Sequence, residues 1–189
     1  MKTKTIVLVV LIIISGCSTL CAQGFYSPQQ GKAVVYFVRV TNSAYVTTFK
    51  YFHNDKYIGE FYGKNYLRYE CEPGKHLIWA SSGNKEFITA QLKEGGTYVV
   101  IVDVIPMFIN SNVGLSPISC NDTVLFQRAK EVISNKKPIV VSGVIIEKTN
   151  MKPESSISKS LKMYDSDWKT TSNFKHILAE MAIPQNAMQ

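Results

Sequence analysis

The sequence lacks the clustered features by which many functions are recognised. It has no run of lysine and arginine long enough to follow a phosphate backbone, so nucleic acid is not expected as a partner. Its three histidines and four cysteines show none of the spacings that zinc sites use, and no metal or other cofactor is expected. Nucleotide-binding glycine loops and the Gly-x-Ser-x-Gly turn of hydrolases are absent too. We therefore predict no catalytic residues and no enzyme.

Glycine, proline and long apolar runs are also scarce. With 11 glycines and 7 prolines in 189 residues, of which 46% are hydrophobic, the composition excludes a disordered or collagen-like chain. The apolar run over residues 6–14 would rise about 14 Å as a helix, roughly half of a bilayer core. Because this run follows Lys2 and Lys4, it is typical of a signal peptide and not of a membrane span.

Two processing sites follow the apolar run. Ile14-Ser15-Gly16-Cys17 matches the bacterial lipobox, in which the cysteine sulfur receives a lipid. Cleavage after Ala22 is the alternative, although Leu20 is large for a site of that kind. The lipobox predicts that Cys17 is lipidated and becomes the first residue of the mature chain.

The lipobox also predicts where the protein is found. Residues 1–16 would be the signal peptide and residues 17–31 a short tether, rich in small and polar residues, between the lipid and the fold. The membrane is then a partner through this anchor. We expect a lipid-anchored protein of the bacterial cell envelope, at the outer membrane because Ser18 and no aspartate follows the cysteine. A periplasmic or secreted protein is the alternative.

Residues 32–120 have the pattern of an antiparallel β-sandwich. Short runs of aromatic and β-branched residues alternate with turn signals such as Asn54-Asp55 and Pro73-Gly74, and Gly74 is expected to take a positive φ. The expected fold is mainly β, an Ig-like sandwich of seven antiparallel strands. The predicted strands are 33–40, 46–53, 56–62, 65–71, 75–81, 86–92 and 97–105.

Residues 121–189 are predicted to form a mixed α/β extension, after a loop over 106–120. A helix that begins at Asn121 or Asp122 would bury one apolar face. The β-branched run 139–146 predicts one further strand. Two more helices are expected, one that opens at Pro153-Glu154 and one that carries Phe174, Ile177, Leu178 and Met181.

Asp103 is the ionisable residue whose place is unusual, because it interrupts an apolar strand. A buried carboxylate can act as an acid or base, but no partner base is apparent, and a strand-end aspartate that faces water or loop amides is the favoured interpretation. An envelope enzyme whose site is assembled from distant residues is the alternative. That alternative requires Asp103, His53 and His76 to converge in one cleft.

Two cysteines of the predicted sandwich are candidates for a disulfide. Cys71 ends a predicted strand and Cys120 lies in a predicted loop, so both could lie at one end of the fold. The cell envelope permits disulfides, but pairing requires Cα atoms within about 7 Å, a distance that a sequence does not show. Two buried free thiols are the alternative.

The segment 49–69 is rich in aromatic rings and is the candidate binding surface. Tyrosine rings can stack on sugars or pack against a protein, whereas the preference of tyrosine for strands explains them without any ligand. If side chains alternate strictly, Tyr57 and Phe61 share one face and Ile58 and Tyr62 the other. We expect Phe61 to be buried and Tyr62 exposed. The candidate binding residues are Tyr51, Tyr57, Tyr62 and Tyr66.

Several turns and strands between residues 33 and 105 resemble the DUF twenty-eight forty-six family of bacterial envelope proteins. The matching pieces are Val35-Tyr36-Phe37-Val38-Arg39, the hairpin Asn54 to Phe61, Glu72-Pro73-Gly74-Lys75-His76, and Glu94 to Val100. Their order is also similar to that of PEGA-like surface sandwiches. One departure is Gly95-Gly96, where the family more often has one glycine followed by lysine.

The resemblance implies a sandwich in an envelope setting, and because the family has no established activity it implies no catalytic residue. The sequence as a whole therefore predicts a non-catalytic, lipid-anchored envelope protein. Its sandwich is expected to bind an envelope protein or a glycan.

Overall fold

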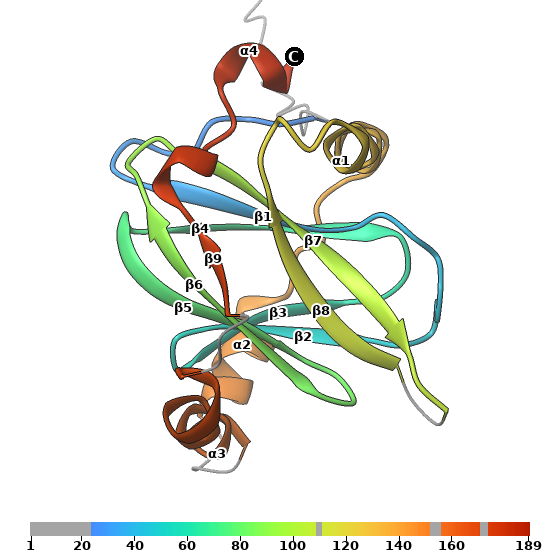
Figure 1. The fold of residues 1–189 in the computed structure, drawn as a ribbon, viewed down its shortest axis with the longest axis vertical. Helices are drawn as coiled ribbons and strands as arrows, with labels where there is room; N and C mark the ends of the chain where they lie inside the picture. The colour runs from blue at the N-terminus through green and yellow to red at the C-terminus, as the bar shows by residue number, and fades with distance from the viewer. Residues whose placement is uncertain (1–23, 109–110, 152–155, 171–173) are drawn as a thin grey trace, which may run out of the picture.

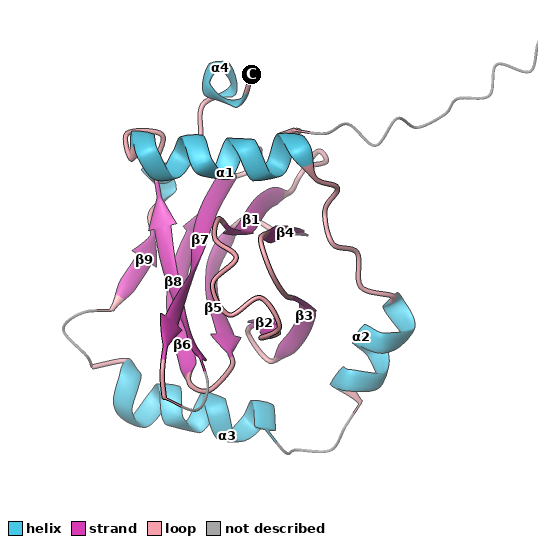
Figure 2. Ribbon diagram, turned by 90° about the vertical axis from the view of Figure 1, so that its right-hand side faces the viewer, coloured by secondary structure: helices cyan, strands magenta, loops and turns pink. Residues whose placement is uncertain are grey.

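In a computed structural model that describes residues 24–108, 111–151, 156–170 and 174–189, two β-sheets pack face to face. Helices lie against the outer face of each sheet (Figures 1 and 2). The strands are β1 (Ala33–Arg39), β2 (Phe49–His53), β3 (Lys56–Phe61), β4 (Asn65–Cys71), β5 (Gly74–Ser81), β6 (Lys85–Leu92), β7 (Thr97–Pro106), β8 (Ser111–Ile118) and β9 (Lys175–Ile177).

Helical segments occupy most of the C-terminal third of the chain. They are α1 (Thr123–Asn135), α2 (Gly143–Asn150), α3 (Ser156–Met163), the π-helical turn η1 (Tyr164–Trp168), the 3₁₀ turn η2 (Ala179–Met181) and α4 (Gln185–Met188). None of the helices in the described ranges is long and apolar enough to cross a membrane.

The first sheet has the strand order β4-β1-β7-β8. Its strand β1 pairs antiparallel with β4 and parallel with β7, and every residue of β1 is buried. The continuous apolar run predicted that both faces of this strand are covered, and the structure confirms it. The parallel pair corrects the expectation of a purely antiparallel sandwich.

The second sheet has the order β3-β2-β5-β6-β9. Strand β9 pairs in parallel with β6, so a segment from the far C-terminal end completes this sheet. The seven predicted strands are present as β1–β7, but the described structure contains β8 and β9 as well. Strand β8 was missed because Gly114 and Pro117 are typical of a loop, whereas proline is tolerated in an edge strand such as this one.

The C-terminal predictions are confirmed only in part. Helix α1 forms as expected and buries Phe126, Ala129, Val132 and Ile133. The expected strand over 139–146 is wrong, because Ile139 forms only an isolated bridge with Leu67 and α2 begins at Gly143. The expected last helix is also wrong, since its residues form β9 and η2.

Three hydrophobic clusters hold the layers together. The largest fills the space between the sheets and includes Phe37, Tyr51 and Leu115. A second lies between the first sheet and α1. The third joins Trp79 and Phe87, on the outer face of the second sheet, to α3, η1 and neighbouring residues. Because helices cover the outer faces, many aromatic side chains that point away from the inter-sheet core are also buried.

Candidate functional site

The four tyrosines of the predicted binding surface do not lie together on the outside. Tyr51 and Tyr66 are fully buried and Tyr57 is nearly so, whereas Tyr62 has 54% of its surface exposed. The prediction of a common exposed surface is therefore wrong for three of the four residues. They are covered because Tyr51 packs between the sheets, Tyr57 in the cluster beside α3 and Tyr66 in the cluster beneath α1.

A β-bulge explains why strict alternation fails in this hairpin. The register of β2 with β3 shifts between Tyr51 and Phe52, which leaves Ile58 as the extra residue. As a result Ile58 and Phe61 both point into the cluster between the sheets, while Tyr57 points to the outer cluster. The buried Phe61 and the exposed Tyr62 are as predicted.

The candidate disulfide is not formed, because Cys71 and Cys120 are both free thiols. Cys71 ends β4 at one edge of the first sheet, and Cys120 follows β8 at the other edge. Three strand spacings of about 4.8 Å separate these edges, which exceeds the Cα separation of about 7 Å that a disulfide allows. The two side chains also pack on opposite faces of the sheet. Burial raises the pKa of Cys71 to about 11.

Asp103 belongs to a polar group that fastens β9 to the first sheet. Its Oδ2 accepts a hydrogen bond of 2.6 Å from Ser116 Oγ on β8. Lys175 of β9 donates to Ser116 Oγ at 3.3 Å and to the Leu115 carbonyl at 3.0 Å, and it pairs with Glu86 at 3.6 Å. The Asp103 carboxylate thus has a hydrogen-bond partner and lies near the edge of the sheet.

The histidines His53 and His76 meet each other between the sheets, away from this group. His53 Nε2 lies 2.8 Å from His76 Nδ1, and His53 Nδ1 lies 2.8 Å from the hydroxyl of Tyr69. Burial is the main cause that lowers the pKa of His53 to about 4. Asp103 takes its hydrogen bond from Ser116 and not from either ring, so the convergence that an assembled catalytic site requires is not observed.

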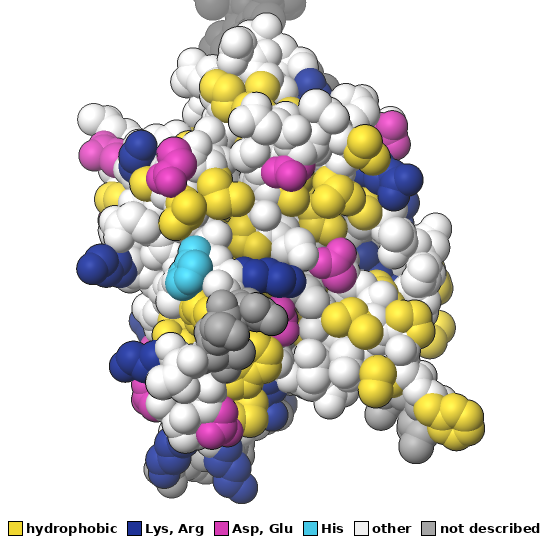
Figure 3. Space-filling view, viewed as in Figure 1, with side chains coloured by type: hydrophobic (Ala, Val, Ile, Leu, Met, Phe, Trp, Pro, Cys, Tyr) yellow, Lys and Arg dark blue, Asp and Glu magenta, His cyan; other side chains and the backbone are white. Residues whose placement is uncertain are grey.

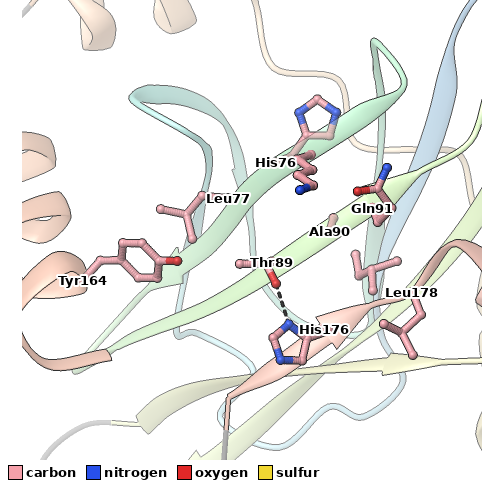
Figure 4. A pocket seen from close by; sticks show the side chains of 10 residues that line it. His76, Leu77, Thr89, Ala90, Gln91, Tyr164, His176 and Leu178 are labelled. Carbon is pink, nitrogen blue, oxygen red and sulfur yellow. Dashed lines mark hydrogen bonds between the residues drawn. The ribbon is translucent and has the colours of Figure 1, made fainter. Parts of the chain in front are cut away.

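A pocket of about 400 Å³ lies on the second sheet where β5, β6 and β9 run side by side (Figure 4). We call it the outer pocket. Tyr164, at the start of η1, closes one side, and Leu178, just after β9, lies on the other. The ten lining residues are Lys75, His76, Leu77, Thr89, Ala90, Gln91, Tyr164, His176, Ile177 and Leu178.

Aromatic packing brings the C-terminal segment to this pocket. Phe87 of β6 lies against the rings of Tyr164 and Trp168, with centroid distances of 5.4 and 5.5 Å. Phe174 then packs against Tyr164 at 5.8 Å and leads directly into β9. Residues almost one hundred positions apart in the sequence therefore face one pocket.

The outer pocket combines apolar walls with a few polar groups. Thr89 Oγ1 and His176 Nδ1 lie 2.6 Å apart in its floor, and Figure 4 shows the His76 ring directed away from this pair. None of the ten lining residues is an aspartate or glutamate, whereas Lys75 supplies a positive charge. Pockets with apolar walls and few polar groups are typical of small-molecule sites.

Sequence reasoning missed this pocket. Of its lining residues, only His76 was considered as a candidate. The signal for β9 is an alternation of only three residues, which is too short to distinguish from a helix by period. In addition, a sequence does not show which strand a segment this distant will join.

A separate exposed apolar group lies where β7 ends. Ile105, Met107 and Phe108 are all exposed, and Figure 3 shows hydrophobic side chains at the lower right of this face, where β7 and β8 project. Charges of both signs are interspersed over the rest of the same face.

Comparisons with known proteins do not assign the chain to a family. No protein-family model matches the sequence, and no curated protein is significantly similar to it. Cys17, the predicted site of lipidation, lies outside the described residues.

Proposed function

We propose that the protein is a non-catalytic binding module of the bacterial cell envelope, held at the membrane by a lipid on Cys17. In this proposal the outer pocket binds a small ligand with an apolar body and a negatively charged or hydrogen-bond-accepting head. The observation that carries it is the assembly of one pocket from β5, β6 and the C-terminal segment, with a positive charge and no carboxylate among its lining residues.

The proposed ligand follows from the chemistry of the lining. Leu77, Leu178 and the ring of Tyr164 would cover the apolar body, which is favourable because it removes apolar surface from water. Thr89 and His176 would bond to the head group, and the ammonium of Lys75 would attract a negative charge. An amine head would find no carboxylate partner among the lining residues.

Octanoate and octylammonium test this pocket, because they share an apolar chain and differ in the sign of the head. We expect octanoate to shift the amide NMR signals of Thr89, His176 and Leu178, and octylammonium to bind more weakly. Leu178→Glu should abolish octanoate binding, because it adds a negative charge beside the pocket. The matched control Ile145→Glu, on the exposed side of α2, should not. No shift at millimolar octanoate, or equal shifts in Leu178→Glu, would contradict the proposed pocket.

The first described residues, Gly24 and Phe25, belong to the predicted tether and contact the folded domain. Phe25 packs against Tyr36 and Phe126, and the amide of Gly24 donates to the carbonyl of Ile133. Part of the predicted tether 17–31 is thus in contact with the first sheet and α1.

Mass spectrometry of the mature N-terminus tests the anchor itself. We expect a first residue Cys17 that carries lipid, because the lipobox lies directly behind the apolar run. A Cys17→Ala variant should lose the lipid and leave the membrane fraction. An unmodified mature chain that begins at Gln23 would contradict the anchor while leaving the pocket proposal open to its own test.

A further inference from the structure

Arg39, the last residue of β1, is a buried cation without a carboxylate partner among the described residues. Its Nη1 donates to the carbonyl of Thr47 at 3.0 Å, and its Nη2 donates to the carbonyls of Ala44, at 2.8 Å, and Ser43. Burying a charge is unfavourable unless hydrogen bonds compensate it. All three hydrogen bonds go to the loop between β1 and β2, so the guanidinium fixes the shape of that loop.

The loop held by Arg39 presents Tyr45. Ala44 has a positive φ of 46°, and a turn is closed by the amide of Thr47, which donates to the Ala44 carbonyl at 2.9 Å. The Tyr45 ring rests on the backbone of Gly63, where a Cβ atom would lie 2.7 Å from the ring. Gly63 also has a φ of +65°, a backbone conformation that favours glycine, and a larger residue there would displace the Tyr45 ring.

Tyr45 and Tyr62 form an exposed aromatic pair. Their ring centroids are 5.6 Å apart and the planes are nearly perpendicular, at 85°. The two side chains have 56% and 54% of their surface exposed. Tyr45 is therefore held in place by its loop and by Gly63, while more than half of the surface of each tyrosine remains exposed.

The pair borders a groove of about 350 Å³, which we call the tyrosine groove. The segment after α1 also borders the groove. It is fixed because the amide of Ile139 donates a hydrogen bond to the carbonyl of Tyr66 at 2.9 Å. The lining of the groove includes side chains that donate hydrogen bonds and side chains that accept them. The lining residues are Tyr45, Thr48, Glu60, Phe61, Tyr62, Gly63, Lys64, Asn65, Lys136 and Ile139.

We propose that the tyrosine groove binds a saccharide built of neutral pyranose units. A pyranose ring has an apolar C–H face, which packs on an exposed aromatic ring, and a rim of hydroxyl groups that both donate and accept. The amide of Asn65, the carboxylate of Glu60 and the ammonium of Lys64 match that rim. An aromatic pair that is already fixed loses little freedom on binding, which favours affinity.

The size of the groove favours a saccharide over a protein partner. A stable protein interface buries about 800 Å² on each partner, whereas the exposed aromatic surface at the tyrosine groove consists of two rings, Tyr45 and Tyr62. The inference rests on the proposed role as a binding module, but not on the outer pocket, which is formed by β5, β6 and β9.

Calorimetric titration of the full chain with tetra-N-acetylchitotetraose and cellotetraose tests the proposal. We expect at least one of these neutral tetrasaccharides to bind, and Tyr62→Ala to weaken the binding about tenfold or more, because the stacking surface is lost. Tyr62→Phe should bind within about twofold of the wild type, because it keeps the ring. The melting temperature of each variant is measured as well. We expect it to be close to that of the wild type, because Tyr62 is exposed.

Two further variants separate this site from the others. Arg39→Met should weaken saccharide binding by loosening the loop, and if it fails to fold, the Tyr62 variants still decide the question. Leu178→Glu should lose octanoate and keep the saccharide, so failure of the outer pocket is distinguishable from failure of the groove. The proposal is overturned if neither tetrasaccharide binds at millimolar concentration or if Tyr62→Ala binds as well as the wild type. The proposal is also overturned if the groove binds a protein instead of a saccharide and the Tyr62→Ala variant loses that protein.

Discussion

His53 lies between Tyr69 and His76 in the space between the sheets, with hydrogen-bond distances of 2.8 Å on both ring nitrogens. Its charged form is disfavoured first by burial, then by the neighbouring His76 and Lys56, while Asp55 acts in the opposite direction. The ring is therefore neutral in the folded protein well below the pH at which an exposed histidine gains its proton.

Acid should destabilise the protein through this residue. Between pH 6.5, the ordinary pKa, and about 4, the pKa in the fold, the unfolded chain binds more protons than the folded one. The stabilising contribution is thus complete above pH 6.5 and is lost as the pH falls to about 4. Urea unfolding at a series of pH values should show a smaller loss of unfolding free energy in His53→Gln than in the wild type. His176→Gln, at an exposed side chain of β9, is the control. An equal loss in all three proteins would contradict the role of His53.

The conformation and burial of single residues could be predicted from the sequence only where neighbouring residues decide them. Gly74 has the predicted positive φ, 123°, at the point where β5 begins directly after Pro73. Tyr57 and Tyr66 were misjudged, because their burial depends on helices that lie far along the chain. Arg39 lies at the end of an apolar run, and nothing in that run indicates that its charge is buried.

At the scale of elements, β9 shows how three residues can complete a sheet. Ile177 is 2% exposed and points into the cluster between the sheets, while its neighbour His176 faces the outer pocket. Lys175 adds hydrogen bonds to β8 at 3.0 and 3.3 Å. A strand that short is held by its side chains as much as by pairing with β6.

Ile177→Ala should therefore destabilise the protein by about 2–4 kcal/mol, because it leaves a cavity in the main core. The matched control Ile145→Ala, on the exposed side of α2, should change the unfolding free energy by less than about 0.5 kcal/mol. Chemical unfolding of both variants measures the difference. Equal effects at the two positions would show that β9 is not docked in the second sheet.

Elements with a strong local pattern were predictable, and the others were not. The strands β1–β7 and helix α1 follow from alternation, continuous apolar runs and helical period. Residues 139–146 have the composition of a strand, yet α2 forms over part of them. Here the tertiary context outweighs the preference of these residues for strands. The outer pocket was not predictable because it needs β9, whose partner strand no local signal specifies.

At the scale of the whole molecule, the two-sheet arrangement decides the chemistry of the cysteines. Cys71 and Cys120 lie at opposite edges and on opposite faces of the first sheet. An oxidising compartment would therefore not join them within one folded chain. Stability comes from the three clusters of apolar side chains instead.

Alkylation under denaturing, non-reducing conditions checks this arrangement. After trypsin digestion of the protein purified without reductant, we expect the peptides 69–75 and 94–128 to carry the alkyl group on Cys71 and Cys120. Before unfolding, Cys120 should react faster, since it is partly exposed while Cys71 is buried and has a raised pKa. A disulfide-linked pair of these two peptides would show that the chain adopts another arrangement of the first sheet.

The parallel pairing of β1 with β7 has a consequence for how the chain folds. The residues that meet, such as Val34 and Thr97, are far apart in sequence, so the loop between them must close before the central pair of the first sheet exists. Folds dominated by such distant contacts reach the native state in milliseconds to seconds and not in microseconds. During that delay the continuous apolar strand β1 has an unpaired edge, which is the kind of segment that seeds aggregation. Until residues 97–106 pair with it, the strand formed by residues 33–39 therefore needs protection from contact with other chains.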